Sequence, residues 1–321
     1  MTVTHTKPPL IVICGPTGIG KTSVAIELAR AFGGEILGAD SMQIYKHMDI
    51  GTAKPTPAER RAVPHHLVDI IEPDAPFDAA RYAETARRVV GNLHKTGILP
   101  FAAGGTGLYI KALTQGIFQV RPVAPGVRDR LRKECEALGA PSLHDRLRQV
   151  DPAAASRLHP NDAFRIIRAL EIFETTGKPM SAHHAEHRFG ESPYSVLKIG
   201  LEMDREVVYE RINRRVDMMI EAGLVQEVQM LLKMGYDPEL KAMQSIGYRH
   251  MVDWLQGRLS WDEAVRTLKR DTRRYAKRQF TWFRKDRDVN WFPPDAVEAI
   301  RRKVKNFLQS VRFHRPKEAG A

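Results

Sequence analysis

The chain has 321 residues, of which 43% are hydrophobic, so it can bury a sizeable core and is longer than one average domain. This composition excludes a disordered protein, and the sequence shows neither an apolar stretch of membrane-spanning length nor the apolar core of a signal peptide at residues 1–8. With 50 Lys and Arg against 38 Asp and Glu, the formal net charge is +12, which favours a polyanionic partner larger than a nucleotide. The two cysteines, Cys14 and Cys135, suggest neither a disulfide framework nor a zinc site, so we expect inert thiols and a cytoplasmic protein.

Strands and helices alternate in the first part of the chain. Short apolar runs predict strands over residues 10–14, 35–39, 66–71 and 99–103. Helical periodicity lies between or after them, over residues 21–32, 78–94 and 106–114. Because such alternation implies a parallel sheet covered by helices, we expect an α/β fold with a P-loop three-layer core.

A glycine-rich phosphate-binding motif follows the first predicted strand. It has the complete pattern G-x-x-x-x-G-K-[ST], formed by Gly15, Pro16, Thr17, Gly18, Ile19, Gly20, Lys21 and Thr22. Between a strand and a helix, the backbone N–H groups of such a loop converge on an anion. Lys21 would neutralise terminal phosphates, and the Thr22 hydroxyl would join a Mg²⁺ shell completed by phosphates and water. Nucleotide hydrolysis, phosphoryl transfer and displacement of a diphosphate leaving group all remain open at this point.

Two further strand ends carry polar residues. Asp40 closes the second predicted strand, and in a parallel sheet the carboxyl ends of the strands point to the ligand crevice. A carboxylate there could accept a proton from a nucleophile, hold Mg²⁺ through water or cap the next turn. The fourth strand is followed by Gly105 and Thr106 instead of an acid, so backbone amides and the Thr106 hydroxyl are expected to face a second part of the phosphate group.

The character of the sequence changes after about residue 121. Strand-like runs vanish, and short helices are predicted over residues 127–138, 142–150 and 164–176. A strand over residues 196–201 and helices over residues 205–222, 225–234 and 261–285 then restore the earlier pattern. We therefore expect a core from residues 1–120 and 196–312, a helical insertion over residues 121–195 and a basic tail over residues 313–321.

The last predicted helix has a row of cations. Arg270, Lys277 and Arg284 lie seven residues apart, and other arginines fill the steps between them. On a helix, this spacing places the charges on one face, where they can meet phosphates. The alternative is an ordinary solvated face, but the net positive charge of the chain favours RNA or DNA.

Taken together, these motifs resemble the tRNA dimethylallyltransferases, also called tRNA isopentenyltransferases. The resemblance rests first on the glycine-rich loop combined with two segments after the second strand, residues 40–45 and 48–55. It continues through residues 104–109, 159–162, 168–171, 215–217, 246–248 and 277–279, and so spans about residues 10–285. The loop occurs in many families, but its combination with residues 40–45 and 51–55 is highly specific.

The resemblance implies transfer of a dimethylallyl group from dimethylallyl diphosphate to N6 of an adenine beside the tRNA anticodon, at position 37. Lys21, the loop and Mg²⁺ would stabilise the departing diphosphate, with further contacts from Thr106 and Arg215. Asp40 is the family-matched base that would remove a proton from the attacking amine. The adenine would leave its stack to reach this site. A cytoplasmic monomer that has no membrane partner is the expected form.

The resemblance also implies a set of tRNA contacts. Around the target base these are Asp40, Ser41, Met42, Gln43 and Thr106. In the insertion they are Arg128, Phe164, Arg165, Ile166, Ile167 and Arg168. In the second part of the core they are Gln244, Ser245, Ile246, Gly247, Tyr248, Arg249, Lys277, Arg278, Gln279 and Arg284. Individually, Arg128 and Arg168 could equally be ordinary surface cations.

Two other function classes share some of these features. A small-molecule P-loop kinase would use the same loop and Asp40, with ATP in the loop and a lid of arginines from the insertion. A nucleic-acid-binding NTPase would also fit the loop and the charge, but the fourth strand does not end in an acid that could prepare water. The excess of basic residues far from the loop argues against the kinase.

Overall fold

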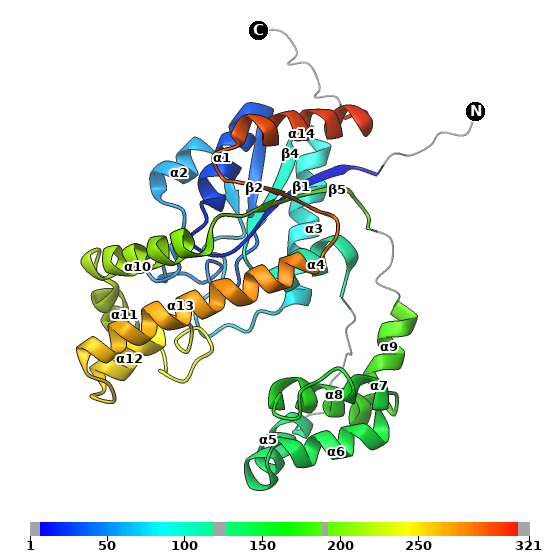
Figure 1. Cartoon of the computed structure of the whole chain (residues 1–321), viewed down its shortest axis with the longest axis vertical. Helices are drawn as coiled ribbons and strands as arrows, with labels where there is room; N and C mark the ends of the chain where they lie inside the picture. The colour runs from blue at the N-terminus through cyan, green and yellow to red at the C-terminus, as the bar shows by residue number, and fades with distance from the viewer. Residues whose placement is uncertain (1–6, 118–125, 188–191, 314–321) are drawn as a thin grey trace. The chain divides into compact units, whose positions relative to one another are not determined.

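The computed structural model describes residues 7–117, 126–187 and 192–313. They divide into two compact units, one formed by the described residues of 1–114 and 192–321 and the other by those of 115–191 (Figure 1). The sequence placed the insertion at residues 121–195. Helices long and apolar enough to cross a membrane are not found in these ranges.

The larger unit is built on a six-stranded parallel sheet. Its strands are β1 (Pro9–Cys14), β2 (Gly34–Gly38), β3 (His65–His66), β4 (Leu99–Gly104), β5 (Ser195–Leu201) and β6 (Val289–Phe292). The order across the sheet is β3-β2-β4-β1-β5-β6, and every pairing is parallel. β1 and β4, which carry the glycine-rich loop and Thr106, are therefore neighbours at the centre, and β2, which leads to Asp40, lies on the other side of β4. The α/β fold with a parallel sheet is confirmed.

Helices cover both faces of this sheet (Figure 1). The first half contains α1 (Lys21–Phe32), α2 (Pro57–Ala62), α3 (Ala79–Lys95) and α4 (Gly107–Gln115). The second half contains α10 (Arg205–Glu221), α11 (Leu224–Lys233), α12 (Tyr248–Leu255), α13 (Trp261–Arg284) and α14 (Val297–Ser310). Leu28 of α1 and Ile300 of α14 pack with Ile11 and Ile13 of β1 in one buried core, because alternate strand residues point to the same face.

The insertion is a separate helical unit with its own core. It contains α5 (Val127–Leu138), α6 (Ala140–Val150), α7 (Pro152–Ala155), α8 (Ala163–Thr176) and α9 (Met180–His187). Leu131, Leu147, Ile166 and Leu170 are fully buried together, which gives this short segment a small hydrophobic centre. The predicted helical character of the insertion is confirmed.

The strands differ from the sequence predictions in two places: one predicted strand is too long, and one strand was not predicted. The predicted strand over residues 66–71 ends at His66, because Leu67 and Asp69 adopt left-handed backbone angles, with φ of 62° and 57°. Ile71 contributes only an isolated bridge to Tyr45. β6 (Val289–Phe292) was missed, because only its first residue, Val289, is buried at the sheet edge and the other three are partly exposed, so the apolar pattern of a central strand is lacking.

Candidate active site

Three loops meet at the carboxyl edge of the sheet. After β2 and β4, the Ala39 N–H donates to the Ala103 carbonyl at 2.8 Å, and the Thr106 N–H donates to the Ala39 carbonyl at 3.1 Å. The Thr106 hydroxyl then accepts a hydrogen bond from the Ser41 N–H at 3.0 Å. Glycine is required at Gly104, since a Cβ there would stand 2.1 Å from the Ala39 carbonyl oxygen. The segments that carry Asp40 and Thr106 are thus fastened to each other.

The glycine-rich loop depends on its glycines for its shape. Gly15, Gly18 and Gly20 have φ of 145°, 82° and 103°, in the region that residues with a Cβ rarely adopt. A Cβ on Gly15 would also lie 2.9 Å from the Leu201 carbonyl oxygen of β5. The loop therefore has the strand-to-helix geometry that its sequence predicts.

Gln279 of α13 ties this loop to the loop after β4. Its side-chain oxygen accepts a hydrogen bond from the Thr17 N–H at 2.8 Å, and its amide nitrogen donates to the Gly105 carbonyl at 2.9 Å. The residue is only 5% exposed. Gln279 was predicted to contact tRNA, but its buried carboxamide is already engaged on both sides, so in this structure it positions the two phosphate-binding loops.

Lys21 and Arg215 bring two cations to the loop. The Lys21 ammonium donates to the Pro16 carbonyl at 2.8 Å. Burial lowers the pKa of Lys21 to about 8; the Asp40 carboxylate opposes this shift and the Arg215 guanidinium adds to it. The pKa of Arg215 is also lowered, by burial and by the nearby Arg211. Within the described ranges Arg215 has neither an ion pair nor a hydrogen bond, so its charge is available to an anion.

Asp40 faces the same space. Its Oδ1 accepts a hydrogen bond from the Met42 N–H at 2.9 Å, which fixes the turn after β2. Burial and the Asp40 carboxylate together raise the pKa of Tyr275 to about 12, against the opposing effect of a hydrogen bond to Thr106. Asp40 therefore lies within electrostatic reach of Lys21 on the phosphate side and of Tyr275 on α13.

The Thr22 hydroxyl is the protein oxygen predicted to bind a metal ion at this edge. The Thr22 hydroxyl, at the start of α1, has no hydrogen-bond partner among the residues that the structure describes. Groups of three or more His, Cys, Asp or Glu that could hold a metal ion are not found in these residues either. One hydroxyl combined with phosphate oxygens and water is a ligand set that Mg²⁺ accepts, so the residues present fit the predicted ion.

The six predicted tRNA contacts in the insertion fall into three pairs. Arg128 and Arg168 both pair with the buried Glu171 carboxylate, each at 2.7 Å. The side chains of Ile166 and Ile167 belong to the insertion core and are not available to a ligand. The remaining two are accessible: Phe164 is 79% exposed, and Arg165 pairs with Asp162 on the surface.

Several predicted tRNA contacts in residues 244–249 are also occupied by the protein itself. Tyr248 is fully buried, and Arg249 pairs with Asp271 at 2.6 Å. The exposed Gln244 donates to the Pro238 carbonyl at 2.9 Å. This segment therefore contributes to folding, and an RNA contact by its buried side chains is not compatible with this conformation.

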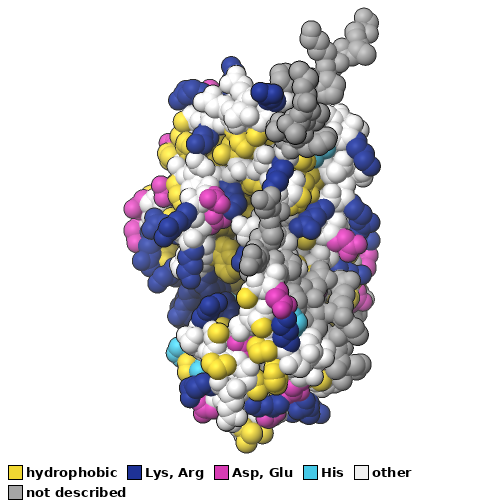
Figure 2. All heavy atoms as spheres, turned by 90° about the vertical axis from the view of Figure 1, so that its right-hand side faces the viewer, with side chains coloured by type: hydrophobic (Ala, Val, Ile, Leu, Met, Phe, Trp, Pro, Cys, Tyr) yellow, Lys and Arg dark blue, Asp and Glu magenta, His cyan; other side chains and the backbone are white. Residues whose placement is uncertain are grey.

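The cationic row on α13 is partly neutralised. Arg270 pairs with Asp271 at 2.8 Å, and Arg284 lies 3.7 Å from Glu202. Lys277 is exposed and has no ion pair in the described residues. Lys277 and Arg284 line a cavity of about 660 Å³ that also reaches Pro16 of the glycine-rich loop. Figure 2 shows a dense group of Lys and Arg side chains at the left edge of its view, as the net charge leads one to expect.

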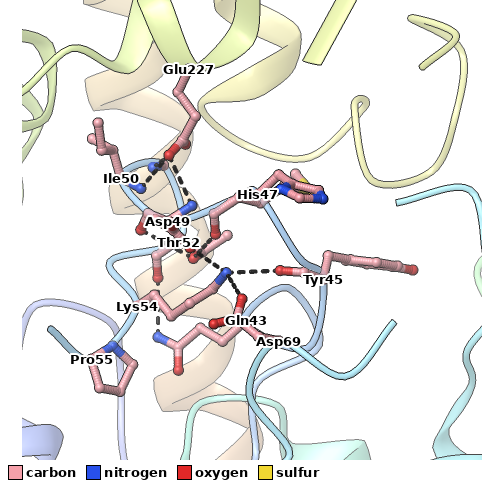
Figure 3. A network of polar contacts seen from close by, with 12 residues as sticks. Gln43, Tyr45, His47, Asp49, Ile50, Thr52, Lys54, Pro55, Asp69 and Glu227 are labelled. Carbon is pink, nitrogen blue, oxygen red and sulfur yellow. Dashed lines mark hydrogen bonds and ion pairs between the residues drawn. The ribbon is translucent and has the colours of Figure 1, made fainter. Parts of the chain in front are cut away.

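Sequence reasoning missed a network around residues 43–55. Glu227 of α11 and the buried Lys54 hold this segment from two sides (Figure 3). One sequence signal was present: Glu227 falls in the apolar stripe of its helix, between Leu224 and Leu231, and an acid there needs partners.

The fold and the site define a parallel α/β protein whose carboxyl edge combines a cation-lined glycine loop with a separate carboxylate. The family model described as IPP transferase matches residues 43–286, and the chain belongs to this family. The expectation of a tRNA-modifying prenyltransferase is thereby confirmed at the level of the family, and the kinase interpretation is not favoured.

Similar proteins and solved structures support the same family. The chain is 54% identical over 305 residues to the tRNA dimethylallyltransferase of Desulfosudis oleivorans, covering 95% of this chain and 97% of that protein. It is 57% identical over 289 residues to that of Syntrophobacter fumaroxidans, covering 90% and 84%. A full-length tRNA isopentenylpyrophosphate transferase from Bacillus halodurans matches with a TM-score of 0.72 and 40% identity, covering 95% of this chain and 98% of that one. A eukaryotic dimethylallyltransferase captured acting on tRNA matches with a TM-score of 0.79 and 26% identity, covering 97% and 81%.

Proposed function

We propose that this protein transfers the dimethylallyl group of dimethylallyl diphosphate to N6 of adenine 37, beside the anticodon of a tRNA, and releases diphosphate. The observation that carries this proposal is the arrangement at the sheet edge. Two desolvated cations, Lys21 and Arg215, stand at the glycine-rich loop, and the Asp40 carboxylate lies within electrostatic reach of Lys21. The two cations suit a polyanionic leaving group, and the carboxylate suits a nucleophile that must lose a proton.

The diphosphate end stabilises the leaving group. As the bond between the allylic carbon and oxygen breaks, its electron pair leaves with the diphosphate, whose negative charge grows. The loop amides, the Lys21 ammonium and the Arg215 guanidinium would bind this charge more strongly than they bind the ground state. Since Arg215 has no other charged partner in the described chain, no existing ion pair has to break first. Mg²⁺, held by the Thr22 hydroxyl and phosphate oxygens, would supply further neutralisation of the diphosphate.

The acceptor end removes a proton. The N6 lone pair of adenine forms the new carbon–nitrogen bond, and one N6 proton passes to the Asp40 carboxylate. The Met42 N–H, bound to Asp40 Oδ1 at 2.9 Å, holds the carboxylate in place, while Thr106 ties the Asp40 segment to the loop after β4. An exocyclic amine is a weak nucleophile because its lone pair is delocalised into the ring, so a positioned base is needed.

The RNA would approach as an anticodon stem-loop with its target base extruded from the stack. Support comes from the net charge of +12 and from Lys277, an exposed cation on the rim of the cavity beside Pro16. Phe164 and Arg165, which remain exposed on the insertion, are the better candidates there, because Arg128 and Arg168 already pair with Glu171. A monomeric state and a cytoplasmic location stay predictions.

The decisive experiment is transfer to an unmodified tRNA. The protein, Mg²⁺ and the tRNA are incubated with either dimethylallyl diphosphate or ATP, and digested nucleosides are weighed by mass spectrometry. We expect prenylated adenosine only with dimethylallyl diphosphate. If the prenyl donor leaves the tRNA unchanged while ATP phosphorylates an acceptor, the proposal fails.

A further inference from the structure

A buried carboxylate holds the backbone of residues 49–51. Glu227 Oε2 accepts hydrogen bonds from the N–H groups of Asp49 and Ile50 at 2.9 and 2.8 Å, and its Oε1 accepts one from Gly51 at 3.1 Å (Figure 3). The Tyr248 hydroxyl donates to Oε1 at 2.5 Å. Glu227 is 8% exposed, so both carboxylate oxygens are satisfied inside the protein.

Two other groups fix the same segment. The Lys54 ammonium, on a side chain that is 2% exposed, donates to the Tyr45 carbonyl at 2.8 Å and pairs with Asp49 and Asp69. Gly51 lies against the Tyr248 ring so closely that a Cβ there would meet the ring at 2.5 Å. Residues 48–54 form a loop, but Glu227 of α11, Tyr248 of α12 and the Lys54 ammonium all fix its position.

This rigid loop determines which way the Gln43 carboxamide faces. The Gln43 amide nitrogen donates to the carbonyls of Thr52 and Ala53, each at 3.1 Å, so both of its hydrogens are used. A flipped carboxamide would place its oxygen against two carbonyl oxygens, so the network selects one orientation. Gln43 Oε1 has no hydrogen-bond partner among the residues described. Gln43 lies three positions after Asp40, in the same turn region.

We propose that Glu227 is a positioning residue which, through the 48–54 loop, fixes Gln43 so that its side-chain oxygen accepts a hydrogen bond from the amino group of the target base. This inference rests on the proposed function and adds a means of choosing the base. An adenine amine has two hydrogens: one passes to Asp40 and the second is held by Gln43. A guanine would place its O6 against the Gln43 oxygen, and two acceptors repel.

The test measures RNA binding without a prenyl donor, so that it does not depend on turnover. Two anticodon stem-loops are compared, one with adenosine and one with purine riboside, which lacks the amino group, at the acceptor position. For the unaltered protein we expect about a tenfold preference for adenosine, the ratio that one or two net hydrogen bonds supply.

Glu227→Gln places an amide in a site built for a carboxylate, where its NH₂ group would face N–H or O–H donors. We expect the preference to fall to about threefold or less, with the KM for dimethylallyl diphosphate unchanged, because the diphosphate loop is untouched. Gln43→Ala should give the same loss, and the double variant should lose no more than Gln43→Ala alone, since both act through one contact. Glu239→Gln, an exposed acid without a side-chain contact in the described residues, is the matched control and should keep the full preference.

Tyr248→Phe keeps the ring against Gly51 and removes only the hydrogen bond to Glu227, so it replaces Glu227→Gln in the test if that variant does not fold. A smaller loss of the adenosine preference in Tyr248→Phe supports the inference. Full adenosine preference in Glu227→Gln or Tyr248→Phe overturns it. So does additive loss in the double variant, which would indicate a general loss of structure. If the unaltered protein prenylates tRNA but does not prefer adenosine, the role of Gln43 is refuted and the proposed function stands. If it prenylates no tRNA, the proposed function itself is refuted.

Discussion

The Gln279 side-chain oxygen accepts a hydrogen bond from the Thr17 N–H at 2.8 Å, across 262 positions of the sequence. Its other end holds the Gly105 carbonyl, so one buried carboxamide sets the spacing of the two loops that would bind diphosphate. Gln279→Leu leaves both backbone groups without a partner, and we expect a loss of about 1–3 kcal/mol in the free energy of unfolding. Urea titration measures this loss, and calorimetry with an inert donor analogue should show weaker binding.

The control for this variant is Gln229→Leu, on the exposed side of α11, where the side chain has no hydrogen bond in the described residues. It should change neither stability nor donor binding. Equal effects in both variants would remove Gln279 from its role in positioning the loops.

Asp40→Asn tests the base. An amide keeps the size of the side chain and can still hold the Met42 N–H through its oxygen, but it cannot take a proton at neutral pH. We expect kcat to fall by about 10²–10⁴-fold, with the Kd for tRNA within about threefold of the unaltered protein. Rapid-quench assays and filter binding measure the two quantities. Asp295→Asn, at an exposed position, is the control and should behave as the unaltered protein. Unchanged turnover in Asp40→Asn would exclude Asp40 as the base.

The lowered pKa of Lys21 predicts that the binding of dimethylallyl diphosphate depends on pH. Because burial lowers its pKa to about 8, Lys21 loses its charge as the pH rises through that value, while a free lysine keeps its charge to about 10.5. The Kd for dimethylallyl diphosphate should therefore be nearly constant below pH 7.5 and rise by up to about tenfold per pH unit above 8. Titrations between pH 6 and 9.5 measure it, and Lys21→Arg, which stays charged, should abolish the rise.

Folding stability should respond to the same group with the opposite sign. Between about pH 8 and 10.5 the unfolded chain keeps the Lys21 proton that the folded chain has lost, so this group makes stability rise with pH. Thermal melts of the unaltered protein and of Lys21→Met should differ less at pH 10 than at pH 7. An equal difference at both pH values would mean that the pKa of Lys21 is not lowered.

Removal of single cations on α13 should separate phosphate contacts from internal ion pairs. Lys277 has no acidic partner within the described chain, so Lys277→Ala should weaken tRNA binding and reduce the slope of log K against log salt by about 1. Arg270→Ala should alter the slope less, because Asp271 already compensates its charge. Lys305→Ala on α14, another exposed cation, is the control. Equal slopes for Lys277→Ala and Lys305→Ala would exclude Lys277 as a phosphate contact.

Much of the architecture follows from local sequence patterns. The apolar run before Gly15 and the stripe Val24, Leu28 on the next helix predict β1 and α1 closely, since both elements depend on periodicity that short segments contain. The parallel sheet follows from the alternation of strands and helices, and the family from the motifs at residues 15–22 and 40–55. Lys21, Asp40 and Thr106 could be placed at one edge of the sheet because they follow strands of that sheet.

Tertiary structure alone decided how those residues are supported and which cations stay free. Arg128 looks like Lys277 in the sequence, but its charge meets Glu171, 43 positions further along the chain, and an ion pair between distant residues has no local signature. Gln279 and Glu227 similarly gain their roles from backbone groups more than 170 residues away. Periodicity determines which face of a helix is buried, whereas the partner that a buried polar group meets depends on how the whole chain packs.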